Sequence, residues 1–185
     1  MQLQTSRVSI RPLTLDDVPE FVAYRRIEAV ARFQSWTTDY SERDAARLVA
    51  EQQGWTLPPE GEWMQFGVHE HGSLAGDLAV HRLADQPGTF EFGVTLAPSH
   101  GGRGIATEAA IALVDALITE HGAHRVVAFC DARNDSVIRL FERVGLRRES
   151  RQVEADWFKG EWTTLEGWAV LAREWAQGRR VGTRR

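Results

Sequence analysis

A short glycine-rich segment carries the residues whose types and spacing indicate chemistry most directly: Gly101, Gly102, Arg103 and Gly104. An apolar, strand-like run precedes them, and a helical pattern of apolar residues begins at Ile105. A strand that turns through glycines into a helix leaves unpaired backbone N–H groups at the positive end of that helix, which is a seat for phosphate. Glycine lets an anion approach the backbone closely, and Arg103 adds a positive charge. The segment therefore predicts a site for a phosphate-bearing small molecule.

Two common nucleotide motifs do not fit this segment. A P-loop needs a lysine and then a serine or threonine after its last glycine, whereas Ile105 follows Gly104. A dinucleotide fingerprint needs a third glycine, and Thr107 stands there when the spacing starts from Gly102 and Gly104. An ordinary glycine-rich connection between a strand and a helix remains the alternative for this segment alone.

A second segment, Asp131–Leu146, follows another apolar run and has the pattern of a capped helix. Asn134 stands where an N-cap is expected, and Gly145 stands where a glycine often closes a helix. The apolar face of this helix consists of Val137, Leu140, Phe141 and Val144. Asn134 is compatible with a capping role, with a direct ligand contact, or with both.

Together the two segments resemble the GNAT acyltransferase superfamily. The glycine segment is similar to the family's acyl-CoA pyrophosphate loop, Gln/Arg-x-x-Gly-x-Gly/Ala, with Gly101 in place of Gln or Arg. The second segment is similar to the family's element that runs from Asn to Gly-Phe. It departs from the family at Val137, where many relatives have serine, and at Phe141, where others have the tyrosine that reprotonates the leaving thiolate.

Landmarks near both ends of the chain resemble one subfamily, the RimJ/RimL-like protein acetyltransferases. The opening phrase is Ile10–Asp17 and the closing hairpin is Trp157–Trp162. With the two central segments, these landmarks occur in the family's order and span about residues 5–175. The resemblance implies a single N-acetyltransferase (GNAT) domain over residues 1–175. A short basic tail, 176–185, follows, and we expect it to be disordered.

The resemblance implies acetyl-CoA, or another acyl-CoA, as the cosubstrate. Backbone amides around the glycines would hold its diphosphate, and the backbone of the preceding strand would pair with pantetheine like an added strand. The residues implied in this binding are Val94, Thr95, Leu96, Gly101, Gly102, Arg103, Gly104, Ile105, Ala106, Thr107 and Asn134. No metal is implied, because His69 and His71 fall at a predicted hairpin turn without a third ligand.

Transfer to an amine requires that the amine be neutral, so a base is expected near the acceptor. Glu91 is the first candidate, because period-two alternation places it with Gly93 and Thr95 on the face of the strand that the resemblance assigns to the acceptor. Asp77, on the preceding strand, is the second candidate. A solvent-exposed carboxylate without a catalytic role remains the alternative for Glu91. The general acid stays unassigned, because Phe141 carries no transferable proton.

These features favour an N-acetyltransferase that moves an acetyl or longer acyl group directly to a primary amine. Aromatic side chains interspersed with carboxylates suit a cationic acceptor, either a small amine or a protein N-terminus. The tryptophans expected to border the acceptor are Trp36, Trp55, Trp63, Trp157 and Trp162. A non-catalytic acyl-CoA sensor or interaction module on the same fold is the alternative, which the absent serine and tyrosine keep open.

The composition favours one cytoplasmic domain. The 185 residues are 43% apolar and 26% charged, and the net charge of −4 argues against a broad surface for nucleic acid or anionic membrane. A single cysteine, Cys130, excludes an intrachain disulfide, and no apolar run has the length of a membrane span. The sequence leaves a homodimer open.

The elements that must position these residues alternate in type along the chain. Strand patterns lie at about 8–12, 63–68, 74–83, 90–96 and 124–130 and in the closing hairpin, and helical patterns begin at about 14, 41, 105 and 134. With the resemblance, this order implies an α/β fold. We expect a GNAT-like, mostly antiparallel mixed sheet of about seven strands, with a parallel, splayed pair at its centre and about four flanking helices.

Overall fold

The computed structural model describes residues 1–182, with side chains as far as residue 178. The strands are β1 (Leu3–Gln4), β2 (Val8–Pro12), β3 (Trp63–Glu70), β4 (Ser73–Arg82), β5 (Thr89–Leu96), β6 (Arg125–Asp131), β7 (Arg147–Phe158) and β8 (Glu161–Leu171). The α-helices are α1 (Val18–Arg25), α2 (Glu28–Ala31), α3 (Glu42–Glu51), α4 (Ile105–Thr119), α5 (Asp135–Val144) and α6 (Ala172–Gly182).

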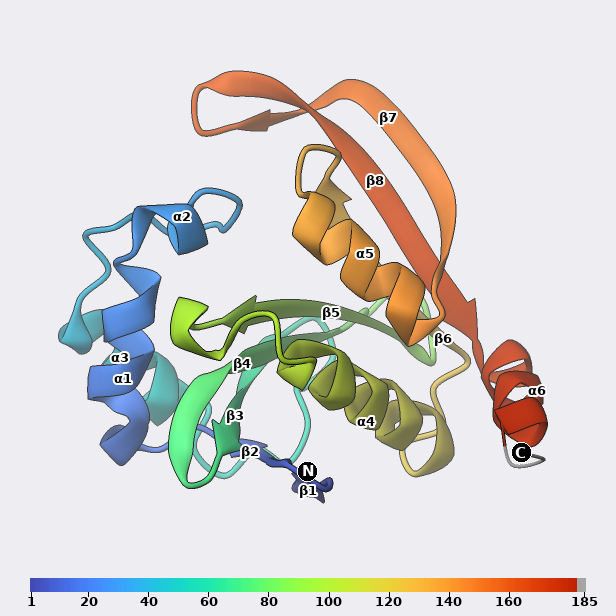
Figure 1. The fold of residues 1–185 in the computed structure, drawn as a ribbon, viewed down its shortest axis with the longest axis horizontal. Coiled ribbons are helices and arrows are strands. Elements are labelled where there is room, and N and C mark those ends of the chain that lie inside the picture. Colours follow the sequence, from blue (N-terminus) through green and yellow to red (C-terminus); the bar gives the residue numbers. More distant parts are fainter. Residues whose placement is uncertain (183–185) are drawn as a thin grey trace.

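All of these strands belong to one sheet, in the order β1-β2-β3-β4-β5-β6-β8-β7 (Figure 1). Neighbouring strands are antiparallel except β5 and β6, which run parallel. This parallel pair is short, because it ends where Glu91 meets Val127. Beyond that point β5 continues to Leu96 against β4, while β6 continues to Asp131 against β8. The two central strands therefore diverge, which confirms the predicted splayed pair.

The structure confirms the predicted fold class and adds three small elements to it. The sheet has eight strands where about seven were expected, because the two-residue β1 is too short to show a periodicity. Six α-helices replace the expected four, the additional ones being the single-turn α2 and the terminal α6. Helix α6 continues to Gly182, within the segment 176–185 that was expected to be a tail, and the expected disorder of that tail stays a prediction. Residues 183–185 lie outside the described residues.

Helix starts follow the capping signals of the sequence. Ser41 Oγ accepts a hydrogen bond from the backbone N of Asp44, and Asn134 Oδ1 accepts one from Val137 N, so both residues cap the helices that follow them. Near the first helix, the Asp17 carboxylate accepts hydrogen bonds from Thr14 N and from the Arg11 guanidinium, both at 2.8 Å.

A histidine that could have suggested a metal also contacts this carboxylate. His69 Nε2 lies 2.8 Å from Asp17 Oδ1. Burial opposes ionisation of Asp17, but the hydrogen bonds from Arg11 and His69 outweigh it and hold the pKa well below its usual range. Among the residues that the structure describes, no group of three or more His, Cys, Asp or Glu side chains could hold a metal ion.

Helices cover the sheet from both sides. On one side α4 and α5 pack against the main core, where the rings of Phe92 and Phe141 meet edge to face with centroids 5.8 Å apart. On the other side α1 and α3 form a second core with Leu74 at the start of β4. Alternation along β5 thus separates the Phe92 face from the Thr95 face, as predicted. The strand ends between these two layers are where the candidate site lies.

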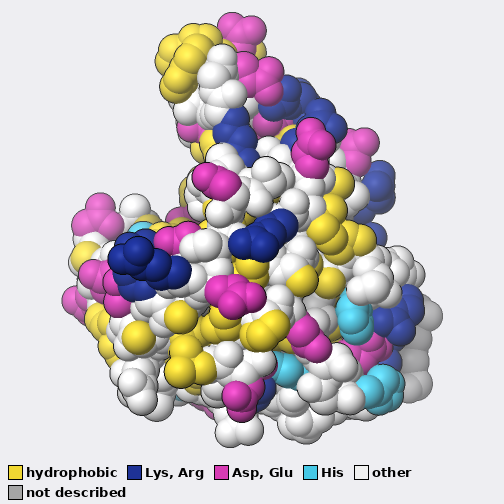
Figure 2. Space-filling model, turned by 90° about the vertical axis from the view of Figure 1, so that its left-hand side faces the viewer, with side chains coloured by type: hydrophobic (Ala, Val, Ile, Leu, Met, Phe, Trp, Pro, Cys, Tyr) yellow, Lys and Arg dark blue, Asp and Glu magenta, His cyan; other side chains and the backbone are white. Residues whose placement is uncertain are grey.

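The β7–β8 hairpin extends beyond the two layers and curves toward α2 (Figure 1). Trp157 and Trp162 lie near its tip, with ring centroids 5.2 Å apart and about 60% of each residue exposed. Figure 2 shows hydrophobic side chains gathered at this projecting end of the molecule. Within residues 1–182, no helix is both long and apolar enough to cross a membrane.

Candidate active site

A cleft of about 480 Å³ opens where β5 and β6 diverge. Seven of the residues predicted to bind the cosubstrate line it: Val94, Thr95, Leu96, Gly101, Gly102, Ala106 and Asn134. They come from β5, from the turn after it, from the first turn of α4 and from the start of α5. The fold thus brings together segments that are 40 residues apart in the chain, from Val94 to Asn134.

One edge of β5 is open along this cleft. Val94 pairs with Leu78 of β4, and Leu96 pairs with Gly76, but neither has a partner in β6 because the parallel pairing has already ended. Backbone groups on an unpaired strand edge can accept an extended ligand as an additional strand. The geometry therefore fits the predicted pairing with pantetheine.

The turn after β5 presents unpaired amides at the start of α4. Gly102 and Gly104 both have positive φ, +73° and +79°, and Gly104 is the N-cap of α4 without a side-chain cap. The first hydrogen bond that closes a turn of α4 is donated by Glu108 N to Gly104 O at 3.0 Å. The N–H groups of the three residues before Glu108 therefore have no acceptor within the helix, which is the arrangement that binds phosphate.

Four of the predicted binding residues lie outside the cleft lining. The Arg103 guanidinium forms an ion pair with Glu70 at the end of β3, while 51% of the Arg103 side chain is exposed. Ile105 is fully buried in the core. Gly104 and Thr107 line a neighbouring groove on the other side of the turn. The glycine turn itself borders the cleft through Gly101 and Gly102, while its role in binding stays a prediction.

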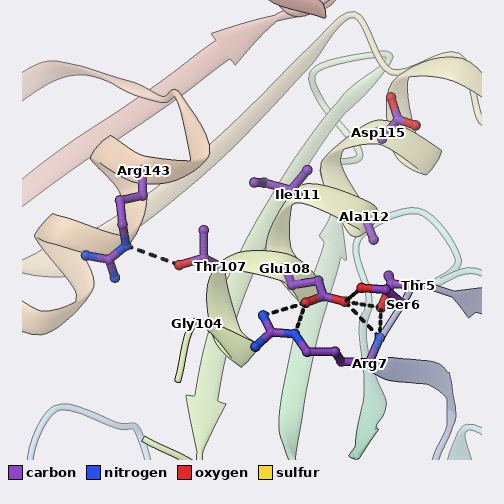
Figure 3. Close-up of a pocket in the computed structure, with 10 residues that line it drawn as sticks. All are labelled: Thr5, Ser6, Arg7, Gly104, Thr107, Glu108, Ile111, Ala112, Asp115 and Arg143. Atoms are coloured by element: carbon purple, nitrogen blue, oxygen red, sulfur yellow. Dashed lines mark hydrogen bonds and ion pairs between the residues drawn. The ribbon is translucent and has the colours of Figure 1, made fainter. Parts of the chain in front are cut away.

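The neighbouring groove has a volume of about 640 Å³ and is shown in Figure 3. On one side, Glu108 binds the segment between β1 and β2: it accepts hydrogen bonds from Thr5 Oγ1 and from Arg7 Nε, each at 2.6 Å. Arg7 also donates to the backbone oxygen of Arg103 at 2.8 Å. This contact fixes the glycine turn against the N-terminal strands.

On the opposite side of the groove, Arg143 of α5 donates from Nε to Thr107 Oγ1 of α4 at 3.2 Å (Figure 3). Arg143 lines both the groove and the cleft. Arg143 therefore borders the glycine turn from the side of α5, while Arg7 borders it from the side of the N-terminal strands. The sequence offers one weak signal for Arg143, its place near the end of the helix that Asn134 caps.

Glu91 lies on the face of β5 opposite α4 and α5. It is directly opposite His81 of β4, with His81 Nδ1 at 3.7 Å from Glu91 Oε2, and the imidazole stacks on the Trp63 ring of β3 with centroids 4.8 Å apart. Partial burial raises the pKa of Glu91, and the neighbouring His81 partly offsets that rise. Gly93, two residues farther along the same face, lines the cleft, so Glu91 lies about 7 Å from it along the strand.

Asp77 does not line the cleft. Its side chain is 2% exposed, Tyr24 donates a hydrogen bond to it at 2.6 Å, and Arg25 lies 3.1 Å away. Burial raises the pKa of Asp77, while the charge of Arg25 and the hydrogen bond from Tyr24 act against that rise. Because both carboxylate oxygens are already bound, this placement argues against the predicted role of Asp77 as a base and indicates a structural one.

Ser136 and Cys130 are among the polar residues of the cleft that had no predicted binding role. Many relatives have serine at the position of Val137. Here Ser136, one residue earlier, lines the cleft. Cys130 lines it as well, and burial raises the pKa of its thiol to about 12, so the thiol stays protonated.

The five tryptophans expected around the acceptor do not form one cluster. Trp157 and Trp162 pair at the hairpin tip, whereas Trp63 stacks on His81 and Trp55 packs against the main core. Trp36 covers the guanidinium of Arg25, 3.7 Å from the ring centroid. None of the five lines the cleft, and Trp36 lies two residues beyond Gln34, which does.

Comparison with known proteins agrees with this geometry. The chain is 25% identical, over 95% of its length and 99% of the relative's, to the uncharacterized N-acetyltransferase YnaD of Bacillus subtilis (strain 168). Spermidine N-acetyltransferase from Vibrio cholerae, solved with CoA and spermine, has a similar fold with a TM-score of 0.80 at 17% identity, covering 93% of this chain and 99% of that one.

A second solved structure of similar fold is RimL, a ribosomal L7/L12 alpha-N-protein acetyltransferase in complex with coenzyme A, with a TM-score of 0.79 at 16% identity. The match covers 92% of this chain and 98% of the RimL chain. This likeness confirms the RimL-like fold expected from the sequence. The acetyltransferase (GNAT) domain family, whose members use acetyl-CoA, matches residues 7–147. The open strand edge, the amides at the start of α4 and this match lead to one conclusion: the chain is an acyltransferase that belongs to the acetyltransferase (GNAT) domain family.

Proposed function

We propose that this protein transfers an acetyl group from acetyl-CoA directly to the primary amine of a small cationic molecule or of a protein N-terminus. The observation that carries the proposal is the divergence of β5 and β6, which leaves the backbone at Val94–Leu96 unpaired beside the open amides of α4. Pantetheine and diphosphate need these two features next to each other.

The positive charge for the diphosphate comes, in this proposal, from Arg143 rather than from Arg103. Arg143 borders both the cleft and the groove beside the glycine turn, while Arg103 is paired with Glu70. A guanidinium suits phosphate because its fork of N–H groups matches two oxygens. The amide side chain of Asn134 lines the same cleft and combines a helix cap with a ligand contact.

Glu91 serves as the base that removes a proton from the acceptor amine. Its raised pKa keeps it closer to the pH range in which a base both accepts and releases protons, and its face leads to the cleft at Gly93. The role of general acid does not fall to Phe141, which is 1% exposed and packed against Phe92. Solvent at the open end of the cleft supplies that proton.

Two acceptor classes are supported by fold neighbours. One of these neighbours is named for spermidine and the other for the α-amine of a ribosomal protein. Both acceptors present a primary amine on an extended, flexible chain. We propose that the acceptor of the present protein is likewise a primary amine on an extended, flexible chain.

The test is an assay of CoA release with acetyl-CoA and a panel of amines, followed by mass spectrometry of the amine. The panel contains spermidine, a peptide with a free α-amine and the same peptide with its α-amine blocked. A mass increase of one acetyl group on the unblocked amines supports the proposal. Tight acetyl-CoA binding without transfer to any amine would instead identify the non-catalytic sensor.

A further inference from the structure

Lys159 is the only lysine in the 185 residues, and it occupies the turn of the β7–β8 hairpin. Its φ is +49° and that of Gly160 is +88°, so both central residues of the two-residue turn have positive φ. Such turns match the twist of the strands they connect, which gives the hairpin a defined tip. The side chain of Lys159 therefore leaves the hairpin from a fixed position.

Lys159 contacts a segment more than a hundred residues earlier in the chain. Its Nζ donates hydrogen bonds to the backbone oxygens of Ala31 and Trp36, both at 2.7 Å. An ammonium group that donates to two carbonyls forms charge-assisted bonds, which are stronger than neutral ones. The hairpin tip, which curves toward α2 in Figure 1, is tied to the segment 28–36 at this point.

The segment that receives these hydrogen bonds is also a wall of the cleft. Ala29, Val30, Phe33 and Gln34 line the cleft, and Ala31 and Trp36 lie between and beside them in the chain. Lys159 therefore connects this wall to the hairpin tip, on the side of the cleft away from the glycine turn.

The wall is itself anchored to the sheet. The Trp36 Nε1 donates to the backbone oxygen of Arg25 at 3.2 Å, and the Trp36 ring lies over the Arg25 guanidinium. Arg25 in turn pairs with the buried Asp77 of β4. A continuous series of contacts therefore runs from β4 through α1 and the segment 28–36 to the hairpin tip.

We propose that Lys159 is a specificity-determining strap: by holding the hairpin tip to the segment 28–36, it narrows the approach of the acceptor and so favours a small amine over a peptide chain end. This inference rests on the proposed acetyl transfer. Neither the acyl donor nor the base is part of the strap, so its loss changes which amine is accepted and leaves acetyl-CoA binding intact.

The strap is tested first without any acceptor, by hydrogen exchange of the full chain. In Lys159→Met, amides in residues 28–36 exchange at least tenfold faster than in the parent, while amides of α4 do not change. Lys159→Arg retains donors that reach both carbonyls and keeps the slow exchange. Equal exchange in the parent and Lys159→Met would overturn the strap.

Specificity is tested with two probes of equal charge, 2-phenylethylamine and a hexapeptide amide without charged side chains. We expect the ratio of kcat/KM for the peptide to that for the small amine to rise at least tenfold in Lys159→Met and to stay constant in Lys159→Arg. An unchanged ratio with faster exchange would overturn the specificity role. If the parent acetylates no amine at all, the proposed function fails, and hydrogen exchange still decides whether the strap exists.

Discussion

The guanidinium of Arg25 and the carboxylate of Asp77 lie 3.1 Å apart, with 4% and 2% of their side chains exposed. The guanidinium is enclosed by aromatic rings, with Phe21 and Trp36 centroids at 3.9 and 3.7 Å. Its Nε has no hydrogen-bond partner among the described residues, which fits a cation held by ring faces. This pair connects β4 to the wall of the cleft.

Replacing Arg25 with Met should lower the free energy of unfolding by about 3–5 kcal/mol, because Asp77 would remain buried without its cation. Denaturation in urea measures the loss. Arg47→Met is the control, since Arg47 is 70% exposed and its ion pairs contribute little. The double variant Arg25→Met, Asp77→Asn should recover part of the loss. A loss below about 1 kcal/mol in the single variant would contradict a structural role for the pair.

Replacing Glu91 with Gln should lower kcat/KM at neutral pH by about 100-fold or more, because the amine loses its proton acceptor. In the parent, kcat/KM should rise with pH as Glu91 ionises, at a pH above the usual range of a glutamate, since burial raises its pKa. The variant should lack that acidic limb and bind acetyl-CoA unchanged. Full activity of Glu91→Gln over the whole pH range would remove Glu91 as the base.

Replacing Gly102 with Val should weaken acetyl-CoA binding at least tenfold, because a β-branched residue disfavours φ of +73° by about 1–2 kcal/mol and distorts the turn. Calorimetric titration of acetyl-CoA measures the change. Gly72→Val is matched to it, since Gly72 has φ of +89° in the turn between β3 and β4, outside the cleft. If both variants lose affinity equally, the effect is general strain and the diphosphate seat is not supported.

Replacing Arg143 with Gln should weaken acetyl-CoA binding by about 10- to 100-fold, the value of a hydrogen bond to a charged group. The loss should shrink for S-acetylpantetheine, a fragment that lacks the diphosphate. Arg139→Gln is the control, because Arg139 is exposed on the same helix and lines neither the cleft nor the groove. If the Arg143 variant and the parent bind acetyl-CoA equally well, the positive charge for the diphosphate comes from another residue.

The stability of the protein should depend on Glu108 between about pH 2 and pH 4.5. Partial burial opposes ionisation of Glu108, but hydrogen bonds from Thr5 and Arg7 outweigh it and lower the pKa to about 2, from an ordinary value of 4.5. In this range the unfolded chain binds more protons than the folded one, so stability rises with pH.

The contribution of Glu108 is therefore fully present above about pH 4.5 and is lost as the pH falls toward 2. Urea unfolding of the parent and Glu108→Gln at pH 6 and pH 3 measures it. We expect the parent to be more stable at pH 6 and the difference to narrow at pH 3. A difference that does not depend on pH would show that the ionised form makes no special contribution.

What the sequence by itself determined is local. The turn at Gly102 and Gly104, the caps at Ser41 and Asn134 and the alternation along β5 all depend on residues within one or two turns of each other. The spacing of residues reveals such signals, because the repeats of a helix and of a strand also extend over a few residues. They were sufficient for the fold class and for seven of the residues that line the cleft.

Only the tertiary structure decided the partners of charged side chains. Asp77, a candidate base, has Arg25 and Tyr24 beside it in the fold, and Arg103, a candidate phosphate ligand, is paired with Glu70. Lys159 showed no pattern at all, yet it contacts carbonyls that are 123 and 128 residues away in the chain. The role of a charged side chain depends on the groups that bury it and pair with it. Residue spacing does not predict contacts between residues this far apart in the chain.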